Sequence, residues 1–185
     1  MKLTLIIPCY NEEKNVEPFI KCCIDTFGND KNIEYIFIND GSKDNTFLEI
    51  KNIIEKYDEL NIIGINFSRN FGKEAAMFAG LKKSTGEYTA LIDADLQQHP
   101  KYVKQMLEYI EEHSEYDCVT CYQEKRKESK IIIWLKEKFY SLINKISEVP
   151  FYKNASDFRL FNRKVLNSIL EITEYYRFSK GIFSY

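Results

Sequence analysis

The sequence predicts an α/β fold with a mostly parallel central sheet and helices on both faces. Short apolar runs alternate along the chain with longer segments whose apolar residues recur at helical spacing. The first run, LTLIIP, is apolar almost throughout, as expected of a strand that is covered on both faces. The connections are short, as right-handed crossovers between parallel strands prefer. Together these observations favour one α/β layer structure over separate helical and strand regions.

The elements follow one another in strand–helix pairs. Strands are predicted at residues 3–8, 34–39, 61–66, 88–92 and 116–122. Helices are predicted at residues 15–27, 45–57, 72–83 and 100–113. Asn15 is the expected N-cap of the first helix, with Glu17 and Pro18 in its first turn. The third helix is rich in small residues, including Ala76 and Gly80, and we expect it to lie close to the sheet.

The character of the chain changes after Tyr122. Residues 123–130 (QEKRKESK) are highly charged and are predicted as a loop. Residues 131–146 read as a helix in which lysines interrupt a largely apolar pattern. This helix is either a core helix with solvated lysines or a helix that lies against a membrane interface, and the sequence leaves both open. We therefore divide the domain into a core at residues 1–122 and a second segment at residues 123–185.

Composition narrows the class of protein. The 185 residues are 44% hydrophobic and 29% charged, which is typical of a globular domain. Lys and Arg number 26 against 28 for Asp and Glu, and this net charge of -2 argues against a strongly basic nucleic-acid-binding protein. No signal peptide or apolar run long enough to span a bilayer is evident, so we expect the chain as given to be soluble. The five cysteines are expected to be free thiols.

Polar residues follow each of the first four predicted strands, in the loops PCYNEE, NDGSKDNT, SRNFGK and DADLQQ. Ligands of open parallel sheets bind beyond the carboxyl ends of the strands, so we expect these loops to form one site. Asp93 and Asp95 suit Mg²⁺ or Mn²⁺, although such a pair also occurs in a solvated turn. The sequence lacks both GxxxxGK[ST] and a GxGxxG after the first strand. A metal ion, Arg69 and Lys73 would therefore offset the charge of a diphosphate.

The loop after the second strand offers further polar groups. Asp40 could accept a hydrogen bond from a base or a ribose, whereas Ser42 and Asp44 are better explained as caps of the second helix. His99 is expected in a loop beside the paired aspartates, and His113 at the end of the fourth helix.

Several segments resemble glycosyltransferase family 2, namely PCYNEEKN, INDGSKDNT and SRNFGKEAAMFAGLKKSTGEYTALIDADLQQHP. The similarity is strongest to the polyprenyl-phosphate branch, which includes dolichyl-phosphate mannose synthases and bactoprenol glucosyltransferases. NKIS, SDFRLFNRKV and RFSKGIFSY resemble the bactoprenol members in particular. The resemblance covers essentially the whole chain and implies the GT-A fold. It also implies inverting transfer of a hexose from a nucleoside diphosphate sugar, by default UDP-glucose, to a polyprenyl (undecaprenyl) phosphate.

On the donor side, the resemblance implies roles residue by residue. It places Pro8, Tyr10 and Glu12 on the nucleobase and Asp40 on the base or ribose. Asp93 would contact the ribose or a metal ion, Mg²⁺ or Mn²⁺, with Asp95 and Gln97 as metal ligands. Arg69 and Lys73 would lie near the diphosphate or the sugar.

On the acceptor side, the resemblance places Arg126 and Arg159 near the acceptor phosphate and Asp157 beside the reacting centre. Asp157 would be a base for a hydroxyl acceptor; with a phosphate acceptor it would orient Arg159 or help to bind metal. Arg177 and Lys180 match a basic pair on a closing segment. Asp95, Asp157 and Arg159 are thus the catalytic candidates.

The chain departs from the bactoprenol pattern in two places. Those proteins usually carry a basic pair just after the fifth strand, where this chain has Tyr122 and Gln123. They also continue into membrane helices, so a chain that stops at Tyr185 is expected to be a truncated catalytic domain at the cytoplasmic face of the membrane. The donor sugar and the oligomeric state, including a homo-oligomer, are left open.

Three other functions compete with lipid-phosphate glycosylation. One is transfer to a glycan hydroxyl in capsule or lipopolysaccharide synthesis. The second is a nucleotide-sugar binding module without turnover, which Gln123 alone supports. The third is a phosphatase, which would need a nucleophilic aspartate after the first strand, where this chain has Pro8, Cys9 and Tyr10.

Overall fold

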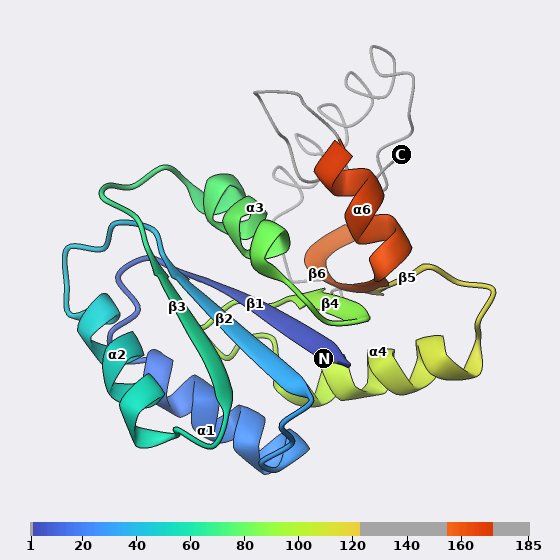
Figure 1. The fold of residues 1–185 in the computed structure, drawn as a ribbon, viewed down its shortest axis with the longest axis horizontal. Coiled ribbons are helices and arrows are strands. Elements are labelled where there is room, and N and C mark those ends of the chain that lie inside the picture. The colour runs from blue at the N-terminus through green and yellow to red at the C-terminus, as the bar shows by residue number, and fades with distance from the viewer. Residues whose placement is uncertain (1, 123–154, 172–185) are drawn as a thin grey trace, which may run out of the picture.

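The computed structural model describes residues 2–122 and 155–171, and six strands within them form one sheet (Figure 1). Their order across the sheet is β3-β2-β1-β4-β6-β5. The strands are β1 (Leu3–Cys9), β2 (Ile33–Asn39), β3 (Asn61–Asn66), β4 (Tyr88–Leu91), β5 (Cys118–Tyr122) and β6 (Ala155–Asn162). Strands β1 to β4 pair in parallel, and β6 runs antiparallel to both of its neighbours. The predicted α/β fold with a mostly parallel sheet is confirmed.

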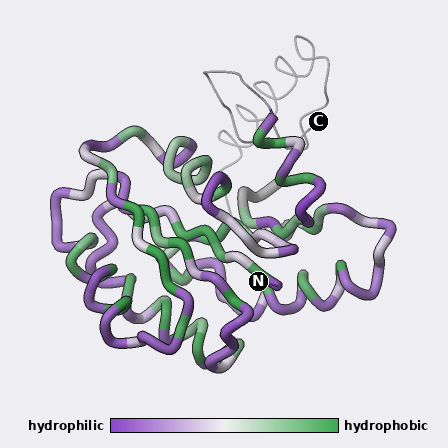
Figure 2. The backbone as a smooth tube through the Cα atoms, viewed as in Figure 1, coloured by the Kyte–Doolittle hydropathy of each residue, from purple (hydrophilic) through white to green (hydrophobic). Residues whose placement is uncertain are grey.

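Helices cover both faces of this sheet (Figure 1). They are α1 (Val16–Phe27), α2 (Thr46–Lys56), α3 (Lys73–Lys83), α4 (Pro100–Glu112) and α6 (Arg163–Glu171). Buried residues of α1, α2 and α4 belong to one apolar core, and those of α3 and α6 belong to a second core. Successive strand residues face opposite cores, as Leu5 and Ile6 of β1 do. Figure 2 shows the apolar residues concentrated in the central strands.

Helix α3 lies very close to the sheet, as its small residues predict. A Cβ atom built on Gly80 would lie 2.5 Å from Ile6 Cγ2 and 3.0 Å from Ile38 Cδ1. Only a glycine therefore allows the helix to approach β1 and β2 this closely. Because α3 begins with Lys73, this packing also fixes the position of the Lys73 backbone beside the ends of the strands.

Strand β6 and helix α6 are the elements that the periodicity does not predict. β6 lies between β4 and β5, with Arg159 opposite both Leu91 and Thr120. The predicted second segment thus contributes a strand to the sheet of the core, while the division at residue 122 itself stays a prediction. The helix predicted at residues 131–146 lies outside the described residues. The predicted strand at residues 116–122 begins two residues later than expected, at Cys118.

The helix ends show how local polar groups are used. Asn15 occupies the N-cap position of α1, but its side-chain amide donates to Glu12 Oε2 and does not cap the helix. His99 is the N-cap of α4, where its Nδ1 accepts from the Lys101 amide at 3.1 Å. His113 follows the last residue of α4, as expected.

Within residues 2–122 and 155–171, no helix combines the length and apolar content needed to cross a bilayer. The five cysteines are free.

Candidate active site

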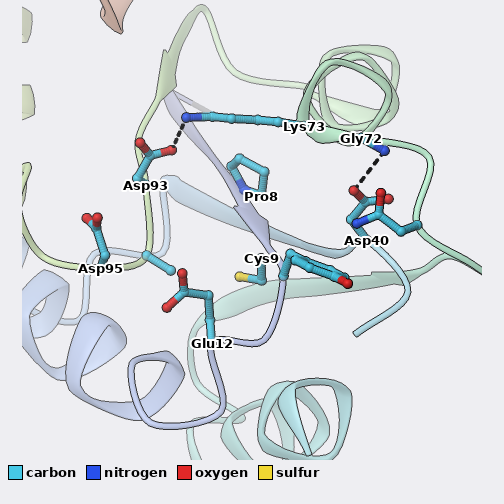
Figure 3. Close-up of a pocket in the computed structure, with 11 residues that line it drawn as sticks. Pro8, Cys9, Glu12, Asp40, Gly72, Lys73, Asp93 and Asp95 are labelled. Carbon is cyan, nitrogen blue, oxygen red and sulfur yellow. Dashed lines mark hydrogen bonds and ion pairs between the residues drawn. The ribbon is translucent and has the colours of Figure 1, made fainter. Parts of the chain in front are cut away.

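A cavity of about 310 Å³ opens where β1, β2 and β4 end (Figure 3). All four of the loops that follow β1 to β4 contribute to it. Its lining residues are Pro8, Cys9, Tyr10, Glu12, Asp40, Asn70, Gly72, Lys73, Asp93, Ala94 and Asp95. Six of the ten residues expected to bind substrate lie in this one cavity, namely Pro8, Tyr10, Glu12, Asp40, Lys73 and Asp93, and the predicted metal ligand Asp95 lies there too. Their assigned contacts with a donor remain predictions.

Hydrogen bonds between the loops after β1 and β2 hold one side of the pocket. The Asn11 amide donates to Ser42 Oγ at 2.9 Å, and the Lys43 amide donates back to Asn11 Oδ1 at 2.9 Å. Ser42 therefore joins the two loops and does not cap α2, contrary to expectation. Asp44 does accept from the amide of Thr46, the first residue of α2, at 3.0 Å. These bonds fix the backbone between Tyr10 and Glu12.

Asp40 is buried, with 3% of its surface exposed, and its carboxylate faces the segment that precedes α3. Its Oδ1 accepts from the Phe71 amide at 2.7 Å, and its Oδ2 accepts from the Gly72 amide at 2.9 Å. The next residue, Gly41, has a φ of +61° and packs directly against the backbone of Arg69. The loops after β2 and β3 are therefore joined tightly beside the pocket.

Lys73 and Asp93 form an ion pair inside the pocket. Lys73 extends past Pro8, and its Nζ lies 2.6 Å from Asp93 Oδ1 (Figure 3). Asp93 is also bound by Gln98, whose Oε1 accepts from the Asp93 amide at 3.1 Å. The pair places one cation beside the paired aspartates, where the charge of a diphosphate would have to be offset.

The turn after β4 decides which polar groups face the pocket. Leu96 has a φ of +60°, and the Gln97 amide donates to Asp95 Oδ1 at 3.1 Å. Gln97 is not among the lining residues, so its role as a metal ligand stays a prediction without geometric support. Gln98, which contacts Asp93, was not singled out from the sequence. Two adjacent glutamines look alike in sequence, and only the turn separates their directions.

The residues of the pocket fit a divalent cation bound in part by phosphate. Within the part of the chain that the structure describes, no group of three or more His, Cys, Asp or Glu residues gathers as a self-sufficient metal site. Asp93 and Asp95 offer carboxylate oxygens from one short turn of the pocket wall. Mg²⁺ and Mn²⁺ accept such a partial set, because water and phosphate oxygens complete their coordination. Lys73 shows that a positive charge is favoured beside Asp93.

Cys9 lies in the pocket but is almost fully buried, with 1% of its surface exposed. Burial, followed by the charge of Glu12, raises the pKa of its thiol far above the usual range. The thiol is therefore neutral, and Cys9 acts as an apolar wall beside the carboxylates rather than as a nucleophile.

Of the other predicted residues, three lie within the described part of the chain and three lie outside it. Arg69 does not line the cavity; its guanidinium lies over the Phe71 ring, 4.7 Å from the ring centroid. Arg159 is buried on β6, where it pairs with Leu91 of β4. Leu91 precedes Asp93 by two residues. Asp157 lies on the same strand as Arg159. The remaining three lie outside the described residues: Arg126, Arg177 and Lys180.

The fold is that of the GT-A glycosyltransferases. TarS 1-349 of S. aureus superposes with a TM-score of 0.63 at 21% identity, over 91% of this chain and 49% of that one. The mannosyltransferase PcManGT from Pyrobaculum calidifontis, solved with GDP-Man and Mn²⁺, superposes with a TM-score of 0.65 at 20% identity. That match covers 91% of this chain and 46% of the mannosyltransferase. At these identities the likeness shows the fold.

Sequence comparison gives the family. The profile of glycosyl transferase family 2 matches residues 4–170, and the chain belongs to this family. CsbB of Bacillus subtilis (strain 168), named as a glycosyltransferase, is 40% identical over 98% of this chain and 54% of its own length. The bactoprenol glucosyl transferase of Shigella phage SfX is 37% identical over 100% of this chain and 60% of its own length. The chain thus spans between half and two thirds of these relatives.

Proposed function

We propose that this chain is the catalytic part of an inverting hexosyltransferase that glucosylates a polyprenyl (undecaprenyl) phosphate, with UDP-glucose as the donor. The observation that carries the proposal is the convergence of Tyr10, Asp40, Lys73, Asp93 and Asp95 in one pocket at the ends of parallel strands. The 37% identity to a bactoprenol glucosyl transferase supports the choice of sugar and of lipid acceptor.

The two sides of the pocket suggest how the donor lies. Pro8, Tyr10 and Glu12 would bind the nucleobase, as the resemblance to family 2 implies, and all three line the same pocket as the paired aspartates. Asp93 and Asp95 would hold the Mg²⁺ or Mn²⁺ that, when bound, supplies positive charge to the diphosphate. Lys73 would add its own charge as the leaving diphosphate becomes more negative, which is the largest electrostatic requirement of the reaction.

The acceptor phosphate needs orientation more than deprotonation. Its second pKa is about 6, so at pH 7 it already carries most of its negative charge. In the reaction, a phosphate oxygen forms a bond to the anomeric carbon while the bond from that carbon to the diphosphate breaks, and UDP leaves. Arg159, on the strand beside β4, would neutralise part of the acceptor charge, with Arg126 nearby. Asp157 would orient Arg159 or help to bind the metal ion.

The lipid acceptor implies that the protein works at the cytoplasmic face of the cell membrane. We place the second segment, residues 123–185, on the acceptor side of the domain and the helix predicted from sequence at residues 131–146 against the lipid headgroups. Arg177 and Lys180 would close over the donor. The supporting observation is the bactoprenol name of relatives that extend well beyond the length of this chain.

The proposal is tested by product analysis. The protein is incubated with undecaprenyl phosphate in detergent, with Mn²⁺ or Mg²⁺, and separately with UDP-glucose, other UDP-hexoses and GDP-mannose. We expect one donor to transfer its sugar to the lipid fraction with release of the nucleoside diphosphate. Transfer only to a soluble glycan would support the hydroxyl-acceptor alternative. Donor binding without transfer to either acceptor would overturn the proposed reaction and indicate a binding module.

A further inference from the structure

The side chain of Gln98 closes the turn that follows β4. At the end of β4 the Ile92 amide still donates to the carbonyl of Ile6 on β1, at 3.1 Å. The next amide, that of Asp93, donates to Gln98 Oε1, also at 3.1 Å. Gln98 thus supplies the acceptor that a neighbouring strand supplies within the sheet. This bond joins the two ends of the loop formed by residues 93–98.

The same side chain also contacts the Asp93 carboxylate. Gln98 Nε2 donates to Asp93 Oδ2 at 3.4 Å, while the other carboxylate oxygen, Oδ1, lies 2.6 Å from Lys73 Nζ (Figure 3). The two oxygens therefore have different partners, and together these partners set the direction of the carboxylate. The bond from Nε2 is long for an N–H···O bond, so this direction depends on how firmly Gln98 itself is held.

The backbone beside Gln98 is anchored by His99. This residue caps α4, because its Nδ1 accepts from the Lys101 amide at 3.1 Å. A neutral ring that accepts at Nδ1 carries its proton on Nε2, and His99 Nε2 lies 3.4 Å from Cys22 Sγ on α1. The residue that follows Gln98 is thus tied to both α4 and α1, which fixes where the Gln98 side chain begins.

The loop that Gln98 closes contains a strained residue. Leu96 has a φ of +60°, in the left-handed region that leucine rarely adopts. Its side chain packs against the apolar core that includes α1, α2 and α4, and the neighbouring Ala94 is buried. Such a conformation persists only where surrounding contacts enforce it. The bonds from Gln98 across the loop are contacts of this kind.

We infer that Gln98 is a positioning residue, which fixes the backbone and the carboxylate of Asp93 at the wall of the pocket, where the proposed metal ion and the donor diphosphate would bind. This inference deepens the proposed function and rests on it for the identity of those ligands. Gln98 is not among the residues that line the cavity, whereas Asp93 is. Gln98 therefore acts through Asp93 and does not itself contact the ligand.

Two variants separate the two hydrogen bonds. Gln98→Glu keeps an oxygen that can accept from the Asp93 amide but has no donor for the Asp93 carboxylate. Gln98→Met has a similar length and loses both bonds. Gln105→Met is the matched control, because Gln105 is an exposed glutamine of α4.

Amide hydrogen exchange tests the closure of the loop without metal or nucleotide. The Asp93 amide should exchange slowly in the unsubstituted protein, in Gln105→Met and in Gln98→Glu, and about tenfold faster in Gln98→Met. The Ile92 amide reports general stability, because it donates to Ile6, and its rate should stay within about twofold. Rapid exchange of the Asp93 amide in the unsubstituted protein, or equal acceleration of both amides in Gln98→Met, would overturn the inference.

A double-mutant cycle separates positioning from direct contact with the ligand. Calorimetric titration with UDP in the presence of Mn²⁺ should show about threefold to tenfold weaker binding for Gln98→Met. In the Asp93→Asn background the same change should cost less than about twofold, because the carboxylate that Gln98 orients is already absent. No loss in the single variant, or additive losses in the double variant, would overturn the inference. If UDP does not bind the unsubstituted protein while the exchange rates are as expected, the proposed donor fails but the hold of Gln98 on Asp93 stands.

Discussion

Lys73 Nζ lies 2.6 Å from Asp93 Oδ1, so the first residue of α3 neutralises a carboxylate that follows β4. The side chains are 43% and 30% exposed, which makes this a partly solvated pair rather than a buried one. The ammonium group thus lies beside the same carboxylate that a divalent cation would bind. If Asp93 holds the proposed metal ion, metal and lysine would compete for its carboxylate until a diphosphate arrives to accept charge from both.

Lys73→Met is therefore expected to have opposite effects on two ligands. Without nucleotide, Mn²⁺ should bind about twofold to fivefold more tightly, because a pair as exposed as this one contributes less than about 1 kcal/mol. UDP should bind more weakly, because the diphosphate loses a cation. Calorimetric titration of each ligand measures both effects, with Lys73→Arg as the charge-preserving control. Weaker Mn²⁺ binding in Lys73→Met would contradict this competition.

Asp95→Ala is expected to remove most of the activity. If Asp95 is a metal ligand, turnover falls about 100-fold or more, because charge on the leaving diphosphate is no longer offset. The addition of Mn²⁺ should also no longer raise the affinity for UDP. The control is Asp25→Ala on α1, an exposed aspartate far along the chain from the pocket loops. Unchanged turnover in Asp95→Ala would end the metal assignment.

Gly41→Ala and Gly28→Ala separate backbone strain from steric overlap. Both glycines have positive φ values, +61° and +69°, but a Cβ at Gly28 would meet nothing within 4 Å. Gly28→Ala should cost about 1–3 kcal/mol of unfolding free energy from backbone strain alone. Gly41→Ala should cost more than about 4 kcal/mol, because its Cβ also overlaps the Arg69 backbone. Urea unfolding measures the two losses, and equal values would show that the two loops can separate at little cost.

The Asp117 carboxylate is expected to make part of the folding stability sensitive to acid. A hydrogen bond from Lys164, at 2.8 Å, and then one from Asn162 lower the pKa of its carboxyl group. A lowered pKa in the folded state means that its stabilising effect is present above the unfolded pKa of about 3.9 and is lost as pH falls through the folded value. Asp117→Asn should therefore lose less stability than the parent protein between pH 5 and pH 2. Urea unfolding across that range, with Asp58→Asn as the exposed control, checks the sign.

The fold class and the donor side of the pocket could be read from the sequence, because both depend on local pattern. The runs of β1 and β2 are buried on both faces, and each of the first four runs ends in a polar loop, so the parallel strands and their converging loops follow from order along the chain. The pairing of Asp93 with Asp95 has the same origin, since the two residues are neighbours on one turn.

The tertiary structure decided what depends on partners far apart in sequence. The insertion of β6 between β4 and β5 is set by backbone pairing with strands more than sixty and more than thirty residues away, and no local periodicity encodes such partners. The direction of the glutamines depends instead on a local backbone conformation: the turn at Leu96, with its positive φ, brings Gln98 rather than Gln97 to Asp93. Asp40 could be read as a ligand of the base, but its burial against the Phe71 and Gly72 amides exists only once β2 and β3 lie side by side. Sequence thus determined which groups gather at the pocket, and packing determined which of them hold one another.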